Sequence, residues 1–202
     1  MPHTRRTRPA STSHSRRAEA DLRMCAEALS AEVDERFLVR LAGRLAAILP
    51  AEYVEIAEIT SGPERSVRPV ALVAHGEEVA GVDYALRDTP GERVLEGGCC
   101  YFSSDVQNAF PHAGLLPQMG VNAYAGIPLV DSFGRILGLM AAMDSRQFPA
   151  PRRSEVILRL FAGRAALELE RQRADRLLLN AILDRVGAPG FVTTDSSGPG
   201  AA

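Results

Sequence analysis

The chain contains no lysine: all 23 of its basic residues are arginines, against 25 acidic residues in 202 positions. Without lysine it cannot carry a phosphate-binding loop of the GxxxxGK[ST] type, which excludes that class of nucleotide-binding protein. Long apolar runs are also lacking, since none approaches the roughly 18 to 20 residues that cross a bilayer. The arginine-rich amino terminus has no apolar segment behind it, unlike a secretion signal. We therefore expect a cytoplasmic protein that does not bind membranes.

Cysteine is scarce, with three residues at Cys25, Cys99 and Cys100. An odd number in a chain of this size does not form a disulfide framework and fits a reducing compartment. A histidine-kinase core and a DNA-binding motif are lacking as well. Any output is therefore expected from another chain, for which a histidine kinase or another signalling protein is a candidate partner.

Basic charge is concentrated at the amino terminus. Residues 1–17 hold five of the 23 arginines and no acidic residue. Their serine, threonine, proline and arginine content offers nothing to bury, which predicts a disordered basic leader. Contact of this leader with nucleic acid or an acidic partner is the alternative, and we do not expect nucleic acid to be bound.

Two helical patterns follow the leader. Residues 18–31 carry a narrow apolar stripe of Leu22, Cys25 and Leu29, typical of a helix that pairs with another helix. We predict an N-terminal linker or dimerisation helix there. A wider apolar stripe over residues 37–48 predicts a helix that packs on a core.

Strand patterns occur in two pairs. The segments "EYVEIAEIT" (52–60) and "RPVALVAH" (68–75) are rich in valine and isoleucine and are separated by the turn-forming "SGPE". They predict an antiparallel hairpin. A second hairpin is predicted for "NAYAGIPLV" (122–130) and "RILGLMAAMD" (135–144), which are joined by the turn "DSFG".

The region between the hairpins, residues 76–120, is irregular. Pro90 predicts the first position of a short helix that begins after Thr89. The segment "CCYF" then predicts a strand, and "SDVQNAF" predicts one or two helical turns. Successive strand residues point to opposite faces, so Cys99 and Cys100 cannot both face one pocket.

A long helix is predicted from Ser154, a plausible N-cap, to Val186, with Gly163 as its weakest position. It would extend about 50 Å at about 1.5 Å per residue, while a domain of this size is about 35 to 40 Å across. Residues 174–187 are therefore expected to project as a C-terminal signalling helix. Their apolar patch "LLLNAIL" needs a partner, and the same patch on a second subunit predicts a homodimer.

Several segments, in order, resemble a GAF domain of bacterial signalling proteins: "TPGERV", the "FP" of Phe110 and Pro111, "NAYAGIPL", "DSFGRILGLMAAMD" and "RAALELER". The resemblance assigns residues 32–173 to this domain. It implies an α+β fold with a central antiparallel sheet of five or six strands and helices on both faces. It further implies a small-molecule pocket between the sheet and the irregular region, and a sensory module whose terminal helices pass the signal on.

The carboxyl end carries a second resemblance. The segment "LLLNAILDRVGAPGFVTTDSSG" looks like the entry into a PAS domain, where a linker helix leads to a first strand. Residues 188–202 are expected to be a flexible tail. A fragment or a truncation of a longer signalling protein is one interpretation, and a chance likeness is the other.

The cysteines are candidates for three kinds of chemistry. Zinc prefers four ligands, usually with cysteines spaced C-x2-4-C. The adjacent Cys99 and Cys100 do not have this spacing, so we do not expect them to form a zinc site with His112. Among GAF proteins, the free methionine-(R)-sulfoxide reductases use well-separated catalytic and resolving cysteines, a pattern that differs from this one. Markers of the phytochrome chromophore site and of the cyclic-nucleotide motif "NKFDE" are missing. The resemblance also implies that Gly91 stands where the family often has cysteine.

The remaining candidates form a mixed pocket wall of tyrosine hydroxyls, one thiol and apolar groups, as small-molecule pockets require. These residues are Tyr84, Val94, Cys99, Cys100, Tyr101, Phe110, Leu116, Met119, Tyr124 and Met140. We predict a non-catalytic sensory or regulatory module that binds an unidentified small molecule and signals through dimerising terminal helices. The alternatives are a thiol-dependent enzyme of the methionine sulfoxide reductase type and a dimerisation scaffold whose core is filled. The sequence identifies no cofactor.

Overall fold

A computed structural model of the chain describes residues 11–30, 33–62, 64–148 and 151–186. The predicted flexible tail and most of the predicted leader lie outside these residues. Within them the helices are α1 (Ser11–Leu29), α2 (Phe37–Ile48), α3 (Pro90–Gly97), α4 (Val106–Ala109), α5 (Leu115–Gln118) and α6 (Pro151–Val186). The strands are β1 (Tyr53–Thr60), β2 (Ser66–Ala74), β3 (Glu77–Glu78), β4 (Tyr84–Ala85), β5 (Cys100–Phe102), β6 (Ala123–Val130) and β7 (Ile136–Asp144).

The strands form one antiparallel sheet in the order β3-β2-β1-β7-β6-β5, with β4 paired to β2 beside this path. Both predicted hairpins are confirmed, because β1 pairs with β2 and β6 pairs with β7. Pairing of β1 with β7 joins the two hairpins into one sheet. The described sheet has seven strands where five or six were predicted. The two-residue strands β3 and β4 make the difference, and their sequence carries no strand pattern.

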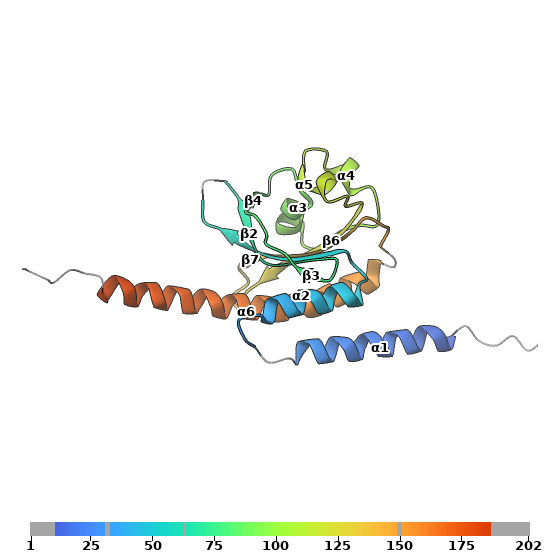
Figure 1. Ribbon diagram of the computed structural model, residues 1–202, viewed down its shortest axis with the longest axis horizontal. Helices are drawn as coiled ribbons and strands as arrows, with labels where there is room; N and C mark the ends of the chain where they lie inside the picture. Colours follow the sequence, from blue (N-terminus) through green and yellow to red (C-terminus); the bar gives the residue numbers. More distant parts are fainter. Residues whose placement is uncertain (1–10, 31–32, 63, 149–150, 187–202) are drawn as a thin grey trace, which may run out of the picture.

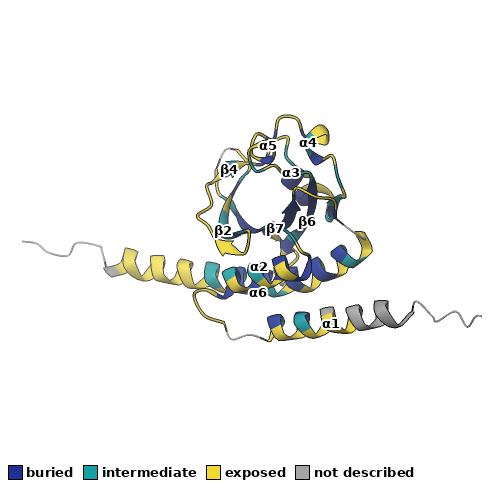
Figure 2. Ribbon diagram, turned by 45° about the vertical axis from the view of Figure 1, so that its right-hand side comes forward, coloured by how far each residue is buried: buried dark blue, intermediate teal, exposed yellow. Residues whose placement is uncertain are grey.

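Helices cover both faces of the sheet, which confirms the predicted α+β fold. Figure 1 shows α2 and α6 under the sheet, with α1 beyond them, while α3, α4 and α5 lie over the other face. Each face has its own apolar core, and the buried residues in Figure 2 lie in two layers on either side of the sheet. Strand β7 serves both cores, because Leu139, Ala141 and Met143 face one and Met140 and Ala142 face the other.

The short helix α3 begins as its sequence predicts. The side-chain oxygen of Thr89 accepts a hydrogen bond from the Glu92 backbone amide at 3.3 Å, which satisfies one of the free amides of the first turn. Pro90 occupies the first turn, where a missing backbone N–H costs nothing. This helix packs on β6 and β7, on the face of the sheet opposite to α2 and α6.

Helix α1 begins at Ser11, so residues 11–17 are helical and their prediction as part of a disordered leader was wrong. Neither proline nor glycine occurs between Pro9 and Leu29, and nothing therefore stops the helix from extending backwards. Cys25 and Ala28 are buried where α1 packs on α2 and α6.

Helix α6 has 36 residues and begins at Pro151, three residues before the predicted start. Ser154 is therefore in the first turn and is 3% exposed, instead of capping the helix. Proline is favoured at the first helical position, which explains the earlier start. The helix is about 54 Å long at about 1.5 Å per residue, and its carboxyl end runs past the sheet (Figure 1).

Candidate functional site

A cavity of about 350 Å³ lies between the sheet and the irregular region, on the face opposite to α2 and α6. Its lining comes from the strands and from the segments that cover them: Glu55, Pro69 and Leu72; Ala80, Gly81, Val82, Tyr84, Ala85 and Arg87; Thr89, Pro90 and Gly91; His112, Ala113, Gly114, Leu115, Leu116 and Met119; Tyr124 and Met143. The volume of this cavity and its mainly apolar wall with a few polar groups are typical of small-molecule sites.

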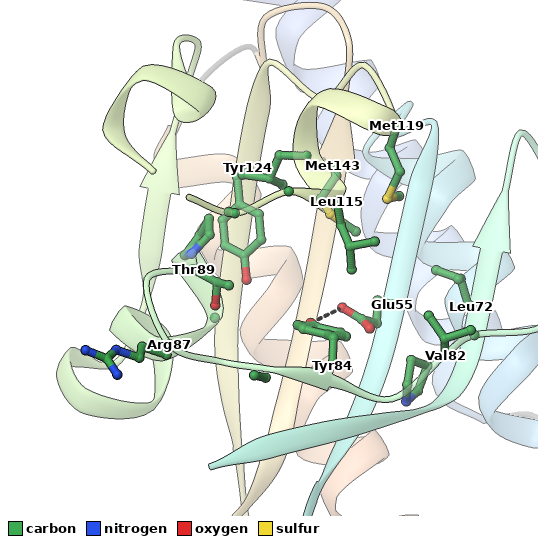
Figure 3. A pocket seen from close by; sticks show the side chains of 18 of the residues that line it. Glu55, Leu72, Val82, Tyr84, Arg87, Thr89, Leu115, Met119, Tyr124 and Met143 are labelled. Carbon is green, nitrogen blue, oxygen red and sulfur yellow. Dashed lines mark hydrogen bonds between the residues drawn. The ribbon is translucent and has the colours of Figure 1, made fainter. Parts of the chain in front are cut away.

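Glu55 is the buried acid of this cavity. It lies in the central strand β1, between Leu72 of β2 and Ala141 of β7, and is 5% exposed. Its carboxylate accepts a hydrogen bond from the Tyr84 hydroxyl at 2.9 Å (Figure 3). Burial raises the pKa of Glu55 to about 7, and the Tyr84 hydrogen bond offsets only part of that rise.

Tyr124 provides the second hydroxyl. Figure 3 shows its ring standing over the cavity from β6, with the oxygen directed inward. The ring lies over Gly126, two residues along the same strand, where a Cβ atom would come within 2.7 Å of the Tyr124 hydroxyl. Glycine at 126 therefore makes room for the tyrosine. Burial raises the pKa of Tyr124 and of Tyr84 well above the ordinary range, so both hydroxyls stay protonated and can donate.

The roof of the cavity is tied to the sheet. The Tyr53 hydroxyl of β1 donates a hydrogen bond to the Met119 carbonyl oxygen at 3.3 Å, just after α5. Met119 and Leu116 thereby lie against the strands that carry Glu55 and Tyr124. His112 lines the exposed rim, and Figure 3 shows the Arg87 side chain pointing away from Glu55.

Four of the predicted wall residues line the cavity: Tyr84, Leu116, Met119 and Tyr124. Three more, Val94, Cys100 and Phe110, belong to the apolar core of the same layer without lining the cavity. The Phe110 ring makes an edge-to-face contact with the Phe102 ring, with 5.5 Å between the ring centroids, and the Arg93 guanidinium lies over the Phe110 ring.

Tyr101, Met140 and Cys99 lie elsewhere, so their placement in the cavity wall was wrong. Met140 is fully buried in the core under α6, and the Tyr101 hydroxyl donates to the Phe148 carbonyl oxygen on that side. Cys99 lies in a hollow beside α6 with Arg159. Strand alternation explains these errors, because residues an odd number of positions from a cavity-facing residue point to the other face.

The two neighbouring thiols point to different layers, as alternation predicts, although neither lines the cavity. Burial raises the pKa of both Cys99 and Cys100. A nucleophilic thiol needs the opposite shift. Within the described residues, no group of three or more histidine, cysteine, aspartate or glutamate side chains is placed to hold a metal ion.

Glu55 and Met143 were missed from the sequence, whereas Gly91 was noted there as a departure from the family pattern. A glutamate inside a strand of otherwise apolar character was the available signal for Glu55. For Gly91, a Cβ atom would lie 2.8 Å from the Leu86 side chain and 3.1 Å from that of Leu139. A cysteine at this position would therefore displace Leu86 and Leu139 of the apolar core beside the cavity.

A family model for the GAF domain matches residues 44–169, which is more than half of the chain. The chain belongs to the GAF family. A search of curated proteins gave no significant match. GAF domains are generally sensory or regulatory modules that bind small molecules and have no catalytic activity of their own, and the cavity over Glu55 lies inside the matched residues of this one. Among the described helices of the GAF protein, none has the length and apolar character to cross a membrane.

The opposite face of the GAF sheet holds a charged cluster at the point where α6 leaves the domain. Glu58 of β1 is 9% exposed and pairs with Arg173 and Arg176 of α6. Arg173 also donates to the carbonyl oxygens of Ile59 and Leu137, at 3.3 and 2.8 Å. Burial alone would raise the pKa of Glu58, but the hydrogen bonds from Arg176 and Arg173 outweigh it and the pKa is lowered. The cluster therefore fixes α6 to β1 as an ion pair.

Proposed function

We propose that this GAF domain is a cytoplasmic sensory module that binds a small molecule in the cavity over Glu55 and reports its presence through α6. The observation that carries the proposal is a mainly apolar cavity with one buried carboxylate and two tyrosine hydroxyls. Such a site offers shape and orientation to a ligand but no activated nucleophile. The free thiols of Cys99 and Cys100 support a reducing compartment.

Strand β1 supports a route from the cavity to α6. Glu55 and Glu58 lie three residues apart on this strand and point to opposite faces of the sheet. A ligand that shifts Glu55 acts on the same short strand that holds Arg173 and Arg176 through Glu58. Two arrangements of α6 with different affinities for the ligand would be enough for signalling, as a population shift.

The far end of α6 supports dimerisation as the output. Four large apolar side chains are exposed there on one side of the helix: Leu178, Leu179, Ile182 and Leu183. An apolar stripe of this kind on a projecting helix fits a second copy of the same stripe. A histidine kinase or another signalling protein would then read the arrangement of the two helices.

Native mass spectrometry of the purified full chain tests ligand binding. A small molecule that remains bound under gentle ionisation and is lost after unfolding and refolding supports the proposal. A protein whose mass equals that of the chain alone, both from cells and after incubation with cell extract, contradicts it.

Analytical ultracentrifugation tests the helix stripe. The double variant Leu179→Glu, Ile182→Glu should sediment as a monomer, while the control Asn180→Glu, Ala181→Glu, with the same added charge on the opposite side, should remain dimeric. A dimer in both variants, or a monomer for the unaltered chain, rejects the proposed seam.

A thiol-dependent enzyme is tested by serine replacement of Cys99 and Cys100. The sensor should keep its fold and its bound molecule in both variants, because neither thiol lines the cavity. A methionine sulfoxide reductase activity in the unaltered protein that disappears in either variant would instead establish the enzyme.

A further inference from the structure

Glu55 is an exception among the buried acids of the described residues. The others, Glu58, Asp131, Asp144 and Glu168, each form an ion pair with arginine. For Glu55 the described residues supply the neutral hydroxyl of Tyr84 and no cation. A buried carboxylate without a cation costs several kcal/mol when it is ionised. Glu55 is therefore an acid in a central strand that no cation of the described residues neutralises.

The space in front of Glu55 matches a missing cation. The Glu55 carboxylate lines the cavity. It has about four acceptor positions, of which one accepts the hydrogen bond from Tyr84, so it can accept further hydrogen bonds from N–H donors. Tyr84 and Tyr124 line the same cavity, and the face of an aromatic ring attracts a cation through the ring quadrupole. Leu72, Met119 and Met143 provide the apolar wall.

We propose that the cavity is selective for a small organic ammonium ion, whose nitrogen lies against the Glu55 carboxylate and whose apolar body fills the space between Tyr84, Tyr124 and the methionines. This assignment rests on the proposed function, because it names the ligand class of the same cavity. A volume of about 350 Å³ is roughly that of a dozen water molecules, so the cavity suits a small molecule.

The other ionisable groups of the cavity do not neutralise Glu55. Tyr84 and Tyr124 are neutral, because burial raises the pKa of both. Arg87 lies at the rim with an 89% exposed side chain beside Asp88, and His112 lies on the exposed rim as well. An anionic ligand would meet the buried carboxylate, and a neutral one would leave the charge of Glu55 uncompensated.

Isothermal titration calorimetry of the refolded full chain tests the assignment with three probes of similar shape: 2-phenylethylamine, 2-phenylethanol and phenylacetate. At pH 8, where Glu55 is ionised, the amine should bind at least about tenfold more tightly than the alcohol. In Glu55→Gln this preference should fall to about threefold or less, because the amide keeps the shape and loses the charge. Tyr124→Phe, which keeps the ring, should retain most of the preference.

Each alternative outcome overturns the assignment. Equal binding of the alcohol or phenylacetate rejects ammonium selectivity, and so does a preference that persists in Glu55→Gln. Absence of amine binding up to about 10 mM rejects it as well. The small-molecule function is judged separately by native mass spectrometry: a neutral or anionic molecule bound in the cavity removes the ammonium assignment and leaves the sensor proposal intact.

Discussion

Replacing Glu55 with glutamine should make the GAF domain more stable at neutral pH, and the gain should grow with pH. The reason is that Glu55 is 5% exposed and its pKa is raised from an ordinary 4.5 to about 7 by burial. Between these values the folded chain holds a proton that the unfolded chain has released. Folding is therefore favoured most below pH 4.5, weakens as the pH rises toward 7, and reaches a lower plateau above it.

The size of the effect follows from the shift. At about 1.4 kcal/mol for each pKa unit, the ionised carboxylate lowers the free energy of unfolding by about 3 kcal/mol at pH 8 relative to pH 4. Roughly 2 kcal/mol of this loss falls between pH 5.5 and pH 8. That window avoids the acid range in which Asp144 and Glu168, whose pKa values are lowered through hydrogen bonds that outweigh burial, lose their own contribution.

Urea denaturation at fixed protein concentration, in steps from pH 5.5 to pH 8, measures this directly for refolded protein. The difference between Glu55→Gln and the unaltered chain should rise by about 2 kcal/mol over the window, since glutamine has no charge to bury. Glu96→Gln, which changes an exposed glutamate of α3 in the same way, serves as the matched control and should show a constant difference. A constant difference for Glu55→Gln, or one that falls with pH, would refute the reasoning.

Three further predictions concern the cavity wall and α6. Gly126→Ala should destabilise the fold by about 1 to 3 kcal/mol and weaken ligand binding, because its Cβ atom would lie 2.7 Å from both the Tyr124 ring and the Val94 side chain; urea denaturation and calorimetry measure the two effects. Gly163→Ala, in the exposed interior of α6 where a Cβ atom meets nothing within 4 Å, should stabilise by about 0.5 to 1 kcal/mol, measured the same way. Arg173→Ala should cost about 2 to 4 kcal/mol in urea denaturation, because it leaves Glu58 and two carbonyl oxygens with fewer donors; Arg185→Ala, at the exposed end of α6, is the control and should have little effect.

Much of the fold could be predicted because its signals are local. Valine-rich segments separated by "SGPE" and "DSFG" specify the two hairpins, and Thr89 with Pro90 specifies the start of α3. The pairing of β1 with β7 joins residues 80 to 90 positions apart, and only the resemblance to the GAF family indicated it. Strands β3 and β4 have two residues each and depend on partners that the local sequence does not reveal.

The cavity wall was harder to predict because it depends on register. Tyr124 pairs with Met143 across β6 and β7, so both face the cavity, whereas Met140 pairs with Ile127 and faces α6. The composition of the sequence suggested that a methionine lies beside Tyr124 but did not distinguish Met140 from Met143. The register shifts between Leu129 and Val130, so counting back from the turn by strict alternation does not identify the methionine that faces Tyr124.

Glu55 and Glu58 illustrate why a charged residue in a strand cannot be interpreted from its own sequence. Both have apolar neighbours in "EYVEIAEIT", and both are buried in the folded chain. Glu58 pairs with arginines that lie 115 and 118 residues further along, where α6 crosses the sheet. Glu55 faces a cavity and has a hydroxyl in place of a cation. One strand thus has an ion-paired acid on its helix side and an acid without a cation on its cavity side, so the proposed ammonium ligand would change the charge on the strand to which α6 is bound.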